Sequence, residues 1–402
     1  MSLSLAGSSS SASSSRGPNG PSQAVLSLRD RGVYIPNLNQ LKVKELRSGH
    51  RQSVRGLGWS IDGRKLASCG ADRIVRVWVP ERSIDHRAST ELRGHTESVD
   101  QLVWHPTNPD VLATASADKT VRIWDTRAKS QQAASGSGTA IPTGPAATSN
   151  SNGSSTGASA AQVIQTPGAN INVSYHPEGN LIAVGDKADT VSIIDTRQNR
   201  IVHTVCTRKP TAPPSLLASQ DSSTGTGKPA TVVGSLDEIN ELCWSANGEL
   251  LFLSSGSGSI FIHSGRDFSR LHTVIGHTAN VFCLQWDPYS RYLASASSDA
   301  MIALWDTHEW YSHKMIRQLT FPARSISFSH DGELLAAGGE DPFIAISATS
   351  PSSDSTDDLV HKIQLPPSTM INTLAWHPSK YVLAYAGDEA AKDIGTVRVF
   401  GL

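Results

Sequence analysis

Residues 94–125 combine the side-chain types of a hydrolytic active site. The stretch reads GHTESVDQLVWHPTNPDVLATASADKTVRIWD and contains His95, Thr114 and Asp118. An imidazole, a hydroxyl and a carboxylate are the groups that a triad hydrolase uses as base, nucleophile and orienting group. The segment therefore raises the hypothesis of catalysis.

The same residue types recur at the same offsets in two further segments, which start at Gly49 and Gly276. A His, a Ser or Thr, an Asp and a Trp form each of the three sets: His50, Ser68, Asp72 and Trp78; His95, Thr114, Asp118 and Trp124; His277, Ser295, Asp299 and Trp305. A catalytic set has no reason to occur three times, whereas a structural unit repeated around a ring does. We therefore predict a hydrogen-bonded chain from indole through hydroxyl and imidazole to carboxylate, and a protein that is not an enzyme.

The repeated unit has the hydrophobic pattern of short β-strands. The runs SVDQLVW, VLATAS and TVRIWD alternate with period two, and a weaker fourth run precedes the next Gly-His pair. Four short strands in about 40–45 residues are typical of one blade of a WD-repeat propeller. Four degenerate units bring the number of units to seven: 170–195, 238–264, 323–347 and 370–401. The sequence thus predicts an all-β, seven-bladed WD40 β-propeller.

The segments outside these units have a different composition. Residues 1–40 are predicted to be a disordered Ser/Gly-rich tail before a propeller over 41–402, with low-complexity loops inserted between blades at 129–161, 207–233 and 349–360. Unit seven ends after its third strand, so we expect residues 41–47, LKVKELR, to supply the fourth and close the ring. On this interpretation, deleting residues 1–47 destabilises the domain, whereas deleting residues 1–30 does not.

One position of the repeat is a candidate binding surface. It follows the apolar residue that opens each first strand, and is occupied by Arg55, Asp100, Asn172, Asn240, Phe282, Arg324 and Asn372. Seven equivalent positions in a closed ring should line one mouth of the central channel. They form either a solvated channel wall or a partner-docking rim, in which Phe282 and the two arginines would be the anchors.

Composition argues against several classes of ligand. The net charge of −1 provides no general basic field for nucleic acid. Cys69, Cys206, Cys243 and Cys283 form no CxxC pair and are expected to be reduced thiols. We expect no cofactor, metal site, membrane contact or small-molecule substrate, since His308 and His313 alone make a poor zinc site and no apolar run reaches 18 residues.

A short motif indicates an alternative function. WDTR at residues 124–127 resembles the signature of propellers that serve as substrate receptors of cullin-4 ubiquitin ligases, and IDTR at 194–197 is a partial copy.

Several longer segments carry a more specific resemblance. RGHTESVDQLVWHPTNPDVLATASADKTVRIWDTR, NINVSYHPEGNLIAVGDKADTVSIID, FPARSISFSHDGELLAAGGEDPFIAIS and the final GTVRVFGL resemble the WD-repeat subunits of the THO complex, the THO complex subunit 3 family. The resemblance covers residues 45–402 apart from the insertions. It implies a nuclear scaffold subunit of the THO/TREX assembly, acting in co-transcriptional mRNP assembly and mRNA export through protein–protein contacts. Its implied partners are the large helical THO subunit and, indirectly, a DEAD-box RNA helicase, with messenger RNA contacted indirectly.

Overall fold

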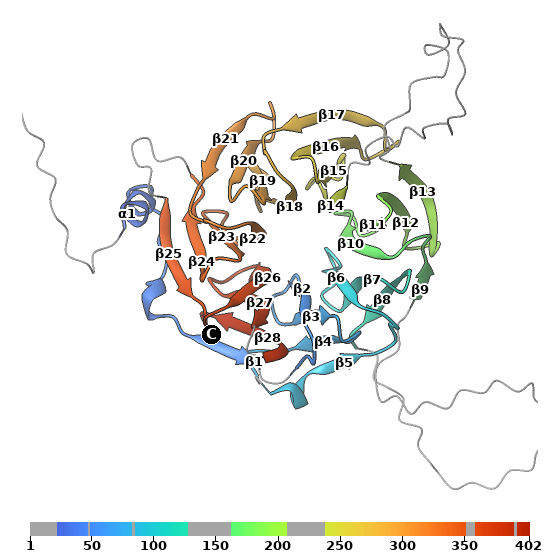
Figure 1. Ribbon diagram of the computed structural model, residues 1–402, viewed down its shortest axis with the longest axis horizontal. Helices are drawn as coiled ribbons and strands as arrows, with labels where there is room; N and C mark the ends of the chain where they lie inside the picture. Colours follow the sequence, from blue (N-terminus) through green and yellow to red (C-terminus); the bar gives the residue numbers. More distant parts are fainter. Residues whose placement is uncertain are drawn as a thin grey trace, which may run out of the picture.

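Seven antiparallel sheets of four strands each form a closed ring (Figure 1). The computed structural model describes residues 22–46, 49–82, 85–127, 162–206, 238–350, 358–389 and 392–402. The predicted all-β, seven-bladed propeller is therefore confirmed.

Within each of blades one to six the strands follow one another outward from the channel in chain order. The strands of blades one to three are β2 Val54–Trp59, β3 Leu66–Gly70, β4 Val75–Trp78, β5 Thr90–Leu92; β6 Val99–Trp104, β7 Val111–Ser116, β8 Thr120–Asp125, β9 Gln162–Gln165; β10 Asn170–Tyr175, β11 Leu181–Asp186, β12 Thr190–Asp195 and β13 Arg200–Cys206. Those of blades four to six are β14 Ile239–Trp244, β15 Leu250–Ser255, β16 Ser259–Ser264, β17 Arg270–Ile275; β18 Val281–Trp286, β19 Tyr292–Ser297, β20 Ile302–Asp306, β21 Ser312–Ile316; β22 Ala323–Phe328, β23 Leu334–Gly339, β24 Phe343–Ala348 and β25 Leu359–Gln364.

Blade seven is built from both ends of the chain. Its strands are β26 Thr369–Trp376, β27 Leu383–Glu389, β28 Lys392–Phe400 and, outermost, β1 Val43–Leu46. β1 pairs antiparallel with β28, from Val43 opposite Phe400 to Leu46 opposite Val397. The expected closing segment 41–47 thus contains β1, which covers the edge that β28 would otherwise expose.

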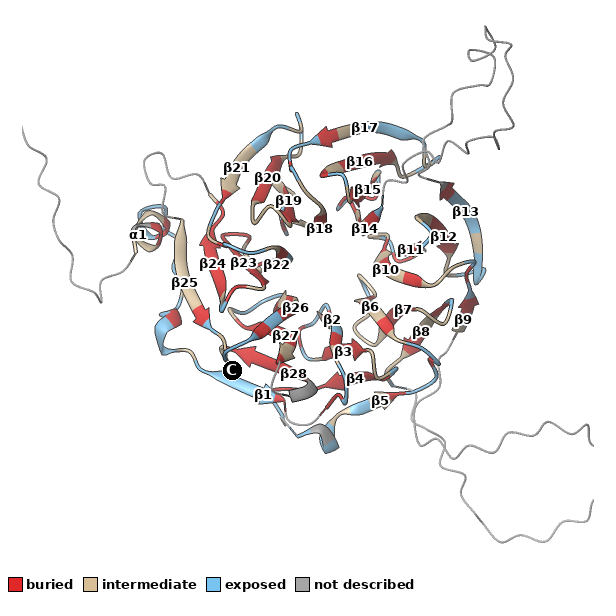
Figure 2. Ribbon diagram, viewed as in Figure 1, coloured by how far each residue is buried: buried red, intermediate tan, exposed pale blue. Residues whose placement is uncertain are grey.

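The core lies between blades rather than within them. Middle strands are buried on both faces, whereas the outermost strands are largely exposed (Figure 2). One apolar cluster joins Ala67 and Val77 of blade one to Leu102 and Trp124 of blade two, and another joins Leu46 and Val397 of blade seven to Val54 of blade one. Since each blade buries its faces only against its neighbours, the blades stabilise one another around the ring.

Two of the predicted insertions lie inside blades rather than between them. β9 pairs with β8, so the segment before Gln162 separates the third and fourth strands of blade two. The segment before β25 does the same in blade six, where Leu359 already belongs to the strand. Only the insertion after β13 separates two blades. Residues 129–161, 207–233 and 351–357 themselves lie outside the described residues.

The predicted disordered tail contains ordered structure. Helix α1, Gln23–Asp30, is followed by the short 3-10 helix η1, Leu38–Gln40; a second 3-10 helix, η2, spans His86–Ala88. Ala24 and Leu28 are buried in one cluster with residues of β24 and β25, and α1 lies beside β25 on the outside of the ring (Figure 1). The prediction of disorder over 1–40 is therefore wrong for this part, and residues 1–21 lie outside the described residues.

A chain of ion pairs holds the end of α1 in place. Arg31 contacts Glu333 of blade six at 2.7 Å, and Glu333 contacts Arg291 of blade five at 3.0 Å. α1 is the longest described helix at eight residues, so none of the described helices is long enough to cross a bilayer.

Truncation should separate the contributions of α1 and β1. Removing residues 1–21 should leave the melting temperature unchanged. Removing residues 1–31 should lower the stability, by about 2 kcal/mol for the buried Leu28 alone, so the expectation of no effect for residues 1–30 is revised. Removing residues 1–46 should lower it most, because β28 loses its partner. Thermal unfolding followed by circular dichroism measures all three, and equal melting temperatures for the 1–46 deletion and the full chain would contradict ring closure by β1.

Candidate functional site

The three residue sets that resemble catalytic triads are structural hydrogen-bond chains. In blade two, Trp124 donates from Nε1 to Thr114 Oγ1 at 2.9 Å, His95 Nε2 lies 2.7 Å from the same oxygen, and His95 Nδ1 lies 2.8 Å from Asp118. A carboxylate only accepts, so Nδ1 carries the proton and Nε2 accepts from the hydroxyl. Ser68 and Ser295 take the place of Thr114 in blades one and five, with the same partners: His50, Asp72 and Trp78, and His277, Asp299 and Trp305.

Accessibility distinguishes these chains from an active site. Thr114, Ser68 and Ser295 are 0% exposed, so no substrate reaches the hydroxyl oxygen. Burial is the main cause that lowers the pKa of His95, and the imidazole and Thr120 hydroxyl hold the pKa of Asp118 far below its usual value despite partial burial. The imidazole therefore stays neutral and fixed between its two partners.

A cavity with a volume of about 660 Å³ lies at the centre of the ring. The first strands of all seven blades line it. Of the predicted rim residues, six line this channel: Arg55, Asp100, Asn172, Phe282, Arg324 and Asn372. Asn240 does not line it, although its carbonyl accepts a hydrogen bond from Asn172 Nδ2.

The rim corresponds to a β-bulge that recurs in every first strand. The register shifts by one residue there, and the extra residues are Arg55, Asp100, Ile171, Asn240, Phe282, Arg324 and Asn372. Asn172 was therefore assigned one position too far along the chain. Asn170 occupies the first-strand position that is apolar in the other blades. It is buried, and its amide forms hydrogen bonds with Thr166 and Thr120. The step from an apolar to a polar residue, from which the rim was predicted, therefore occurs one residue later in this blade.

The rim residues differ in how free they are to bind. Asn372 donates to the Val54 carbonyl and to Asp388, which ties blade seven to blade one. Arg324 pairs with Glu340 at 2.6 Å and lies 5.7 Å from the centre of the Phe282 ring. Arg55 is exposed and has no hydrogen-bond or ion-pair partner within the described ranges.

Below the rim, side chains of one blade satisfy the backbone of the next. Val173 N–H donates to Gln101, Leu374 N–H to Ser325 at 3.1 Å, and Trp376 N–H to Ser327 at 3.0 Å. These donors belong to innermost strands, which have a sheet neighbour on one side only. We call these polar side chains on the first strands, among them Gln101, Ser325 and Ser327, the inner belt. The sequence analysis did not predict it, although small polar residues alternate with apolar ones in the first strand of blade six.

Two half-buried cysteines belong to the same belt. Cys283 faces the backbone N–H of Ile326, and Cys243 faces that of Trp286. Burial is the main cause that raises the pKa of each thiol well above its usual value, so both remain neutral. Cys69, Cys243 and Cys283 are free thiols, as expected, while the Cys206 side chain is outside the described set.

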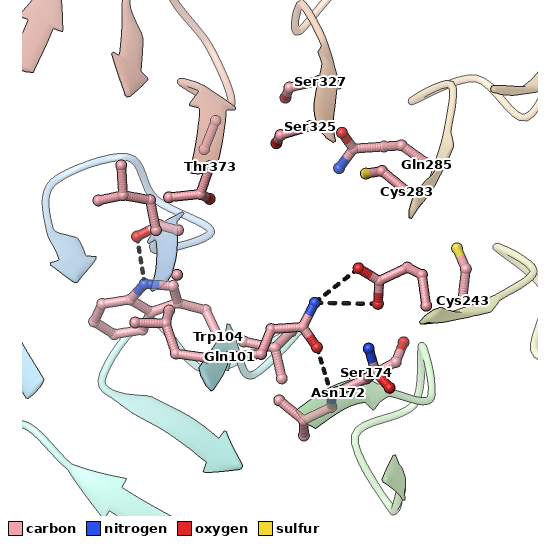
Figure 3. A pocket seen from close by; sticks show the side chains of 18 of the residues that line it. Gln101, Trp104, Asn172, Ser174, Cys243, Cys283, Gln285, Ser325, Ser327 and Thr373 are labelled. Atoms are coloured by element: carbon pink, nitrogen blue, oxygen red, sulfur yellow. Dashed lines mark hydrogen bonds between the residues drawn. The ribbon is translucent and has the colours of Figure 1, made fainter. Parts of the chain in front are cut away.

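One ionisable side chain crosses the belt. Glu241 of blade four accepts hydrogen bonds from Gln101 Nε2 of blade two at 3.1 and 3.0 Å and from its neighbour Leu242 N–H at 3.0 Å (Figure 3). Enclosure by the channel wall raises the pKa of Glu241 to about 7, and the two hydrogen bonds oppose the rise. This pair was not predicted, because it joins blades that are not adjacent.

Other histidine and arginine side chains that are candidates for ligand binding make contacts within the protein instead. His377 Nε2 lies 2.9 Å from the Gly63 carbonyl, so the turn that begins at His377 also joins blade seven to blade one. His313 stacks on Tyr292 with ring centres 5.1 Å apart. Arg127 of WDTR is 64% exposed and pairs with Asp125 at 2.7 Å. The described residues hold no group of three or more metal-ligating side chains.

Comparison with known proteins places this ring among WD-repeat propellers. The family model "WD domain, G-beta repeat" matches residues 42–79, 87–125 and 268–306. The solved β-propeller domain of Cps50 (Swd1) from Myceliophteria thermophila matches with a TM-score of 0.66 and 16% identity, over 90% of this chain and 100% of that one. This likeness concerns the fold alone.

Curated relatives match over most of the chain. THO complex subunit 3 of Arabidopsis thaliana is 33% identical over 358 residues, which cover 88% of this chain and 93% of that protein. WD repeat-containing protein AAC3 of Dictyostelium discoideum is 28% identical over 378 residues, covering 88% of this chain and 66% of that protein. Protein transport protein sec13 of Aspergillus clavatus is 26% identical over 320 residues, covering 73% and 94%.

Thr114→Val tests the structural interpretation of the tetrads. The change keeps the shape but leaves His95 Nε2 and the Trp124 indole without a partner. We expect a loss of roughly 1–3 kcal/mol for each orphaned group in denaturant unfolding. Thr90→Val, on the exposed outer strand β5, is the matched control and should change the stability by less than about 0.5 kcal/mol. Equal midpoints for the two variants would refute the interpretation.

Glu241→Gln should change how stability depends on pH. The pKa of Glu241 is raised from 4.5 to about 7 in the folded state. The folded state therefore holds this proton more tightly, and the wild type loses stability as the pH rises from about 5 to 8. The variant should gain about 1–3 kcal/mol on the wild type at pH 8 and little at pH 5. Glu249→Gln, at an exposed turn of the same blade, should show no such difference; a pH-independent effect of Glu241→Gln would contradict the raised pKa.

Proposed function

Because the chain belongs to the family of THO complex subunit 3, we propose that it is a non-catalytic scaffold subunit of a THO assembly. It would act in the nucleus, in co-transcriptional mRNP assembly and mRNA export, through contacts with other THO/TREX subunits. The observation that carries the proposal is the match to THO complex subunit 3 over 88% of this chain and 93% of that protein.

The arrangement of the polar residues supports a scaffold. Hydroxyl, imidazole and carboxylate groups of three blades are used within the blades, where the hydroxyls are inaccessible. What remains at the surface is a rigid ring with two wide faces, an architecture suited to holding several partners. The net charge of −1 favours contact with RNA through partners rather than directly.

The rim offers the anchors for such a contact. Phe282, Arg324 and Arg55 lie at the channel mouth, and Arg55 has an unpaired charge within the described part of the chain. Aromatic and arginine side chains are the residue types enriched at binding hot spots. We infer that the large helical THO subunit contacts this face, and that a DEAD-box helicase joins indirectly.

The surroundings of Arg127 do not favour a receptor role in a cullin-4 ligase. Arg127 is held by Asp125 and lies 3.6 Å from Asp110, which is the arrangement of a turn ion pair.

Affinity purification from nuclear extract treated with ribonuclease tests the proposed function. The tagged full chain should recover the THO subunits in stoichiometric amounts after RNA digestion, because protein contacts hold the assembly. The double variant Phe282→Ala, Arg324→Ala should reduce that recovery about tenfold or more, the effect of losing one or two hot-spot residues.

A control variant on the face opposite the rim tests whether the loss of subunit recovery is specific to the rim. Arg266→Ala with Tyr311→Ala removes an arginine and an exposed aromatic residue from the connections at the opposite ends of the blades. This variant should recover the subunits as the wild type does. Recovery of cullin-4 components in place of THO subunits would overturn the proposed function, and unchanged recovery by the rim variant would overturn the role of the rim.

A further inference from the structure

Among the described residues, Glu241 is the one charged side chain that lines the channel below the rim. Four residues of charged type line the channel within the described ranges: Arg55, Asp100, Arg324 and Glu241. The first three are at the bulge that forms the rim, whereas Glu241 lies one position further along its strand, with the neutral belt around it. The channel thus leads from a mixed-charge rim to a single carboxyl group.

Within the described part of the chain, this carboxylate has hydrogen-bond donors but no cationic side chain as partners. Among the described residues its partners are Gln101 Nε2 and Leu242 N–H, and no ion pair includes Glu241. A carboxylate has about four lone-pair positions, and its Oε2 atom receives a bond only from Gln101. An enclosed charge without a counter-charge is unfavourable, so a cation that enters the channel gains a strong partner.

The surrounding wall also contains buried polar atoms without a hydrogen-bond partner among the described residues, both the indole N–H donors of Trp244, Trp286 and Trp376 and two amide oxygen acceptors. Gln285 Oε1 is buried without a hydrogen-bond partner, and the Gln285 side chain extends into the cavity on the far side from Gln101 (Figure 3). A guest that donates several hydrogen bonds and carries a positive charge satisfies both groups. A guanidinium has five N–H donors in a plane and binds a carboxylate through two parallel bonds.

Gln101 shows where such a guest would bind. Its amide nitrogen donates to both oxygens of Glu241, the same two acceptors that a bidentate guanidinium takes. The cavity of about 660 Å³ lies in the range of ligand sites, so it accommodates an arginine side chain with part of its peptide. Phe282 of the rim lines the same channel and offers an apolar contact to that peptide.

We propose that the central channel binds an arginine side chain of a protein partner, whose guanidinium replaces the Gln101 amide on Glu241. The inference goes beyond the proposed function, because the site would exist in whatever assembly the chain serves. Glu241 supplies the counter-charge, Gln285 a further acceptor, and the rim the contacts to the flanking peptide.

Calorimetric titration of the full chain at pH 8 tests this site. The probes are acetyl-Gly-Gly-Arg-Gly-Gly-amide and the same peptide with lysine or citrulline in place of arginine. The arginine peptide should bind at least about tenfold more tightly than the lysine peptide, since a single ammonium cannot make the bidentate contact. Citrulline, which keeps the shape and loses the charge, should show no measurable binding.

Three variants locate the binding. Glu241→Gln should weaken the arginine peptide about tenfold or more, whereas Glu249→Gln, which removes the same charge from an exposed turn of blade four, should not. Gln101→Ala removes the internal competitor and should tighten binding, a result that a purely structural role of Gln101 does not predict. Melting temperatures of all variants verify folding.

Several results would overturn the proposal. Equal affinity for the arginine and lysine peptides excludes a guanidinium site, and unchanged affinity in Glu241→Gln excludes this carboxylate. Absence of binding in both the wild type and Gln101→Ala excludes the channel altogether. None of these results alters the composition of the purified assembly, so failure here is distinguishable from failure of the proposed function.

Discussion

The unpaired inner edges of the blades are the constraint on which the rest of the ring depends. Each first strand has a sheet neighbour on one side only, so seven edges of backbone donors and acceptors face the channel. Buried backbone groups need partners, and adjacent blades supply them. Gln101 and Ser325 accept from N–H groups, while the Trp59 and Trp104 indoles donate to the carbonyls of Ala375 and Gly58. The channel wall is therefore polar for structural reasons, and that polarity underlies the proposal that it binds a partner.

The outer strands of the blades must also be covered where the ring closes, and the N-terminal segment covers them. β1 covers β28 in blade seven, while α1 packs on β25 in blade six. Arg31 then reaches Glu333, which also binds Arg291 of blade five. One segment of the chain thus contacts blades six and seven directly and is linked through Glu333 to blade five, on the side where both ends of the propeller meet. Loss of any one contact leaves the others, but loss of β1 leaves an open edge.

The sequence predicted what depends on local pattern and missed what depends on contacts across the ring. Period-two alternation revealed the strands, and an absent fourth strand in unit seven indicated the role of residues 41–47. Asn172 was placed one position wrong because Asn170 fills an apolar position with a hydrogen-bonded amide. β9 escaped notice because its four residues follow a long low-complexity segment. The pair Gln101–Glu241 joins blades two and four, and no spacing along the chain specifies such a contact.

The resemblance of the tetrads to a catalytic triad shows why residue types and even bond order do not define chemistry. The order of bonds from hydroxyl through imidazole to carboxylate is the one that a serine hydrolase uses. The difference is that the oxygen also accepts from a tryptophan indole and is fully buried. A nucleophile needs an open side toward its substrate, and this one has none. We therefore propose that partners bind groups whose bonding capacity is incomplete within the described residues, such as Arg55 on the rim and Glu241 in the channel, rather than the groups that best imitate an enzyme.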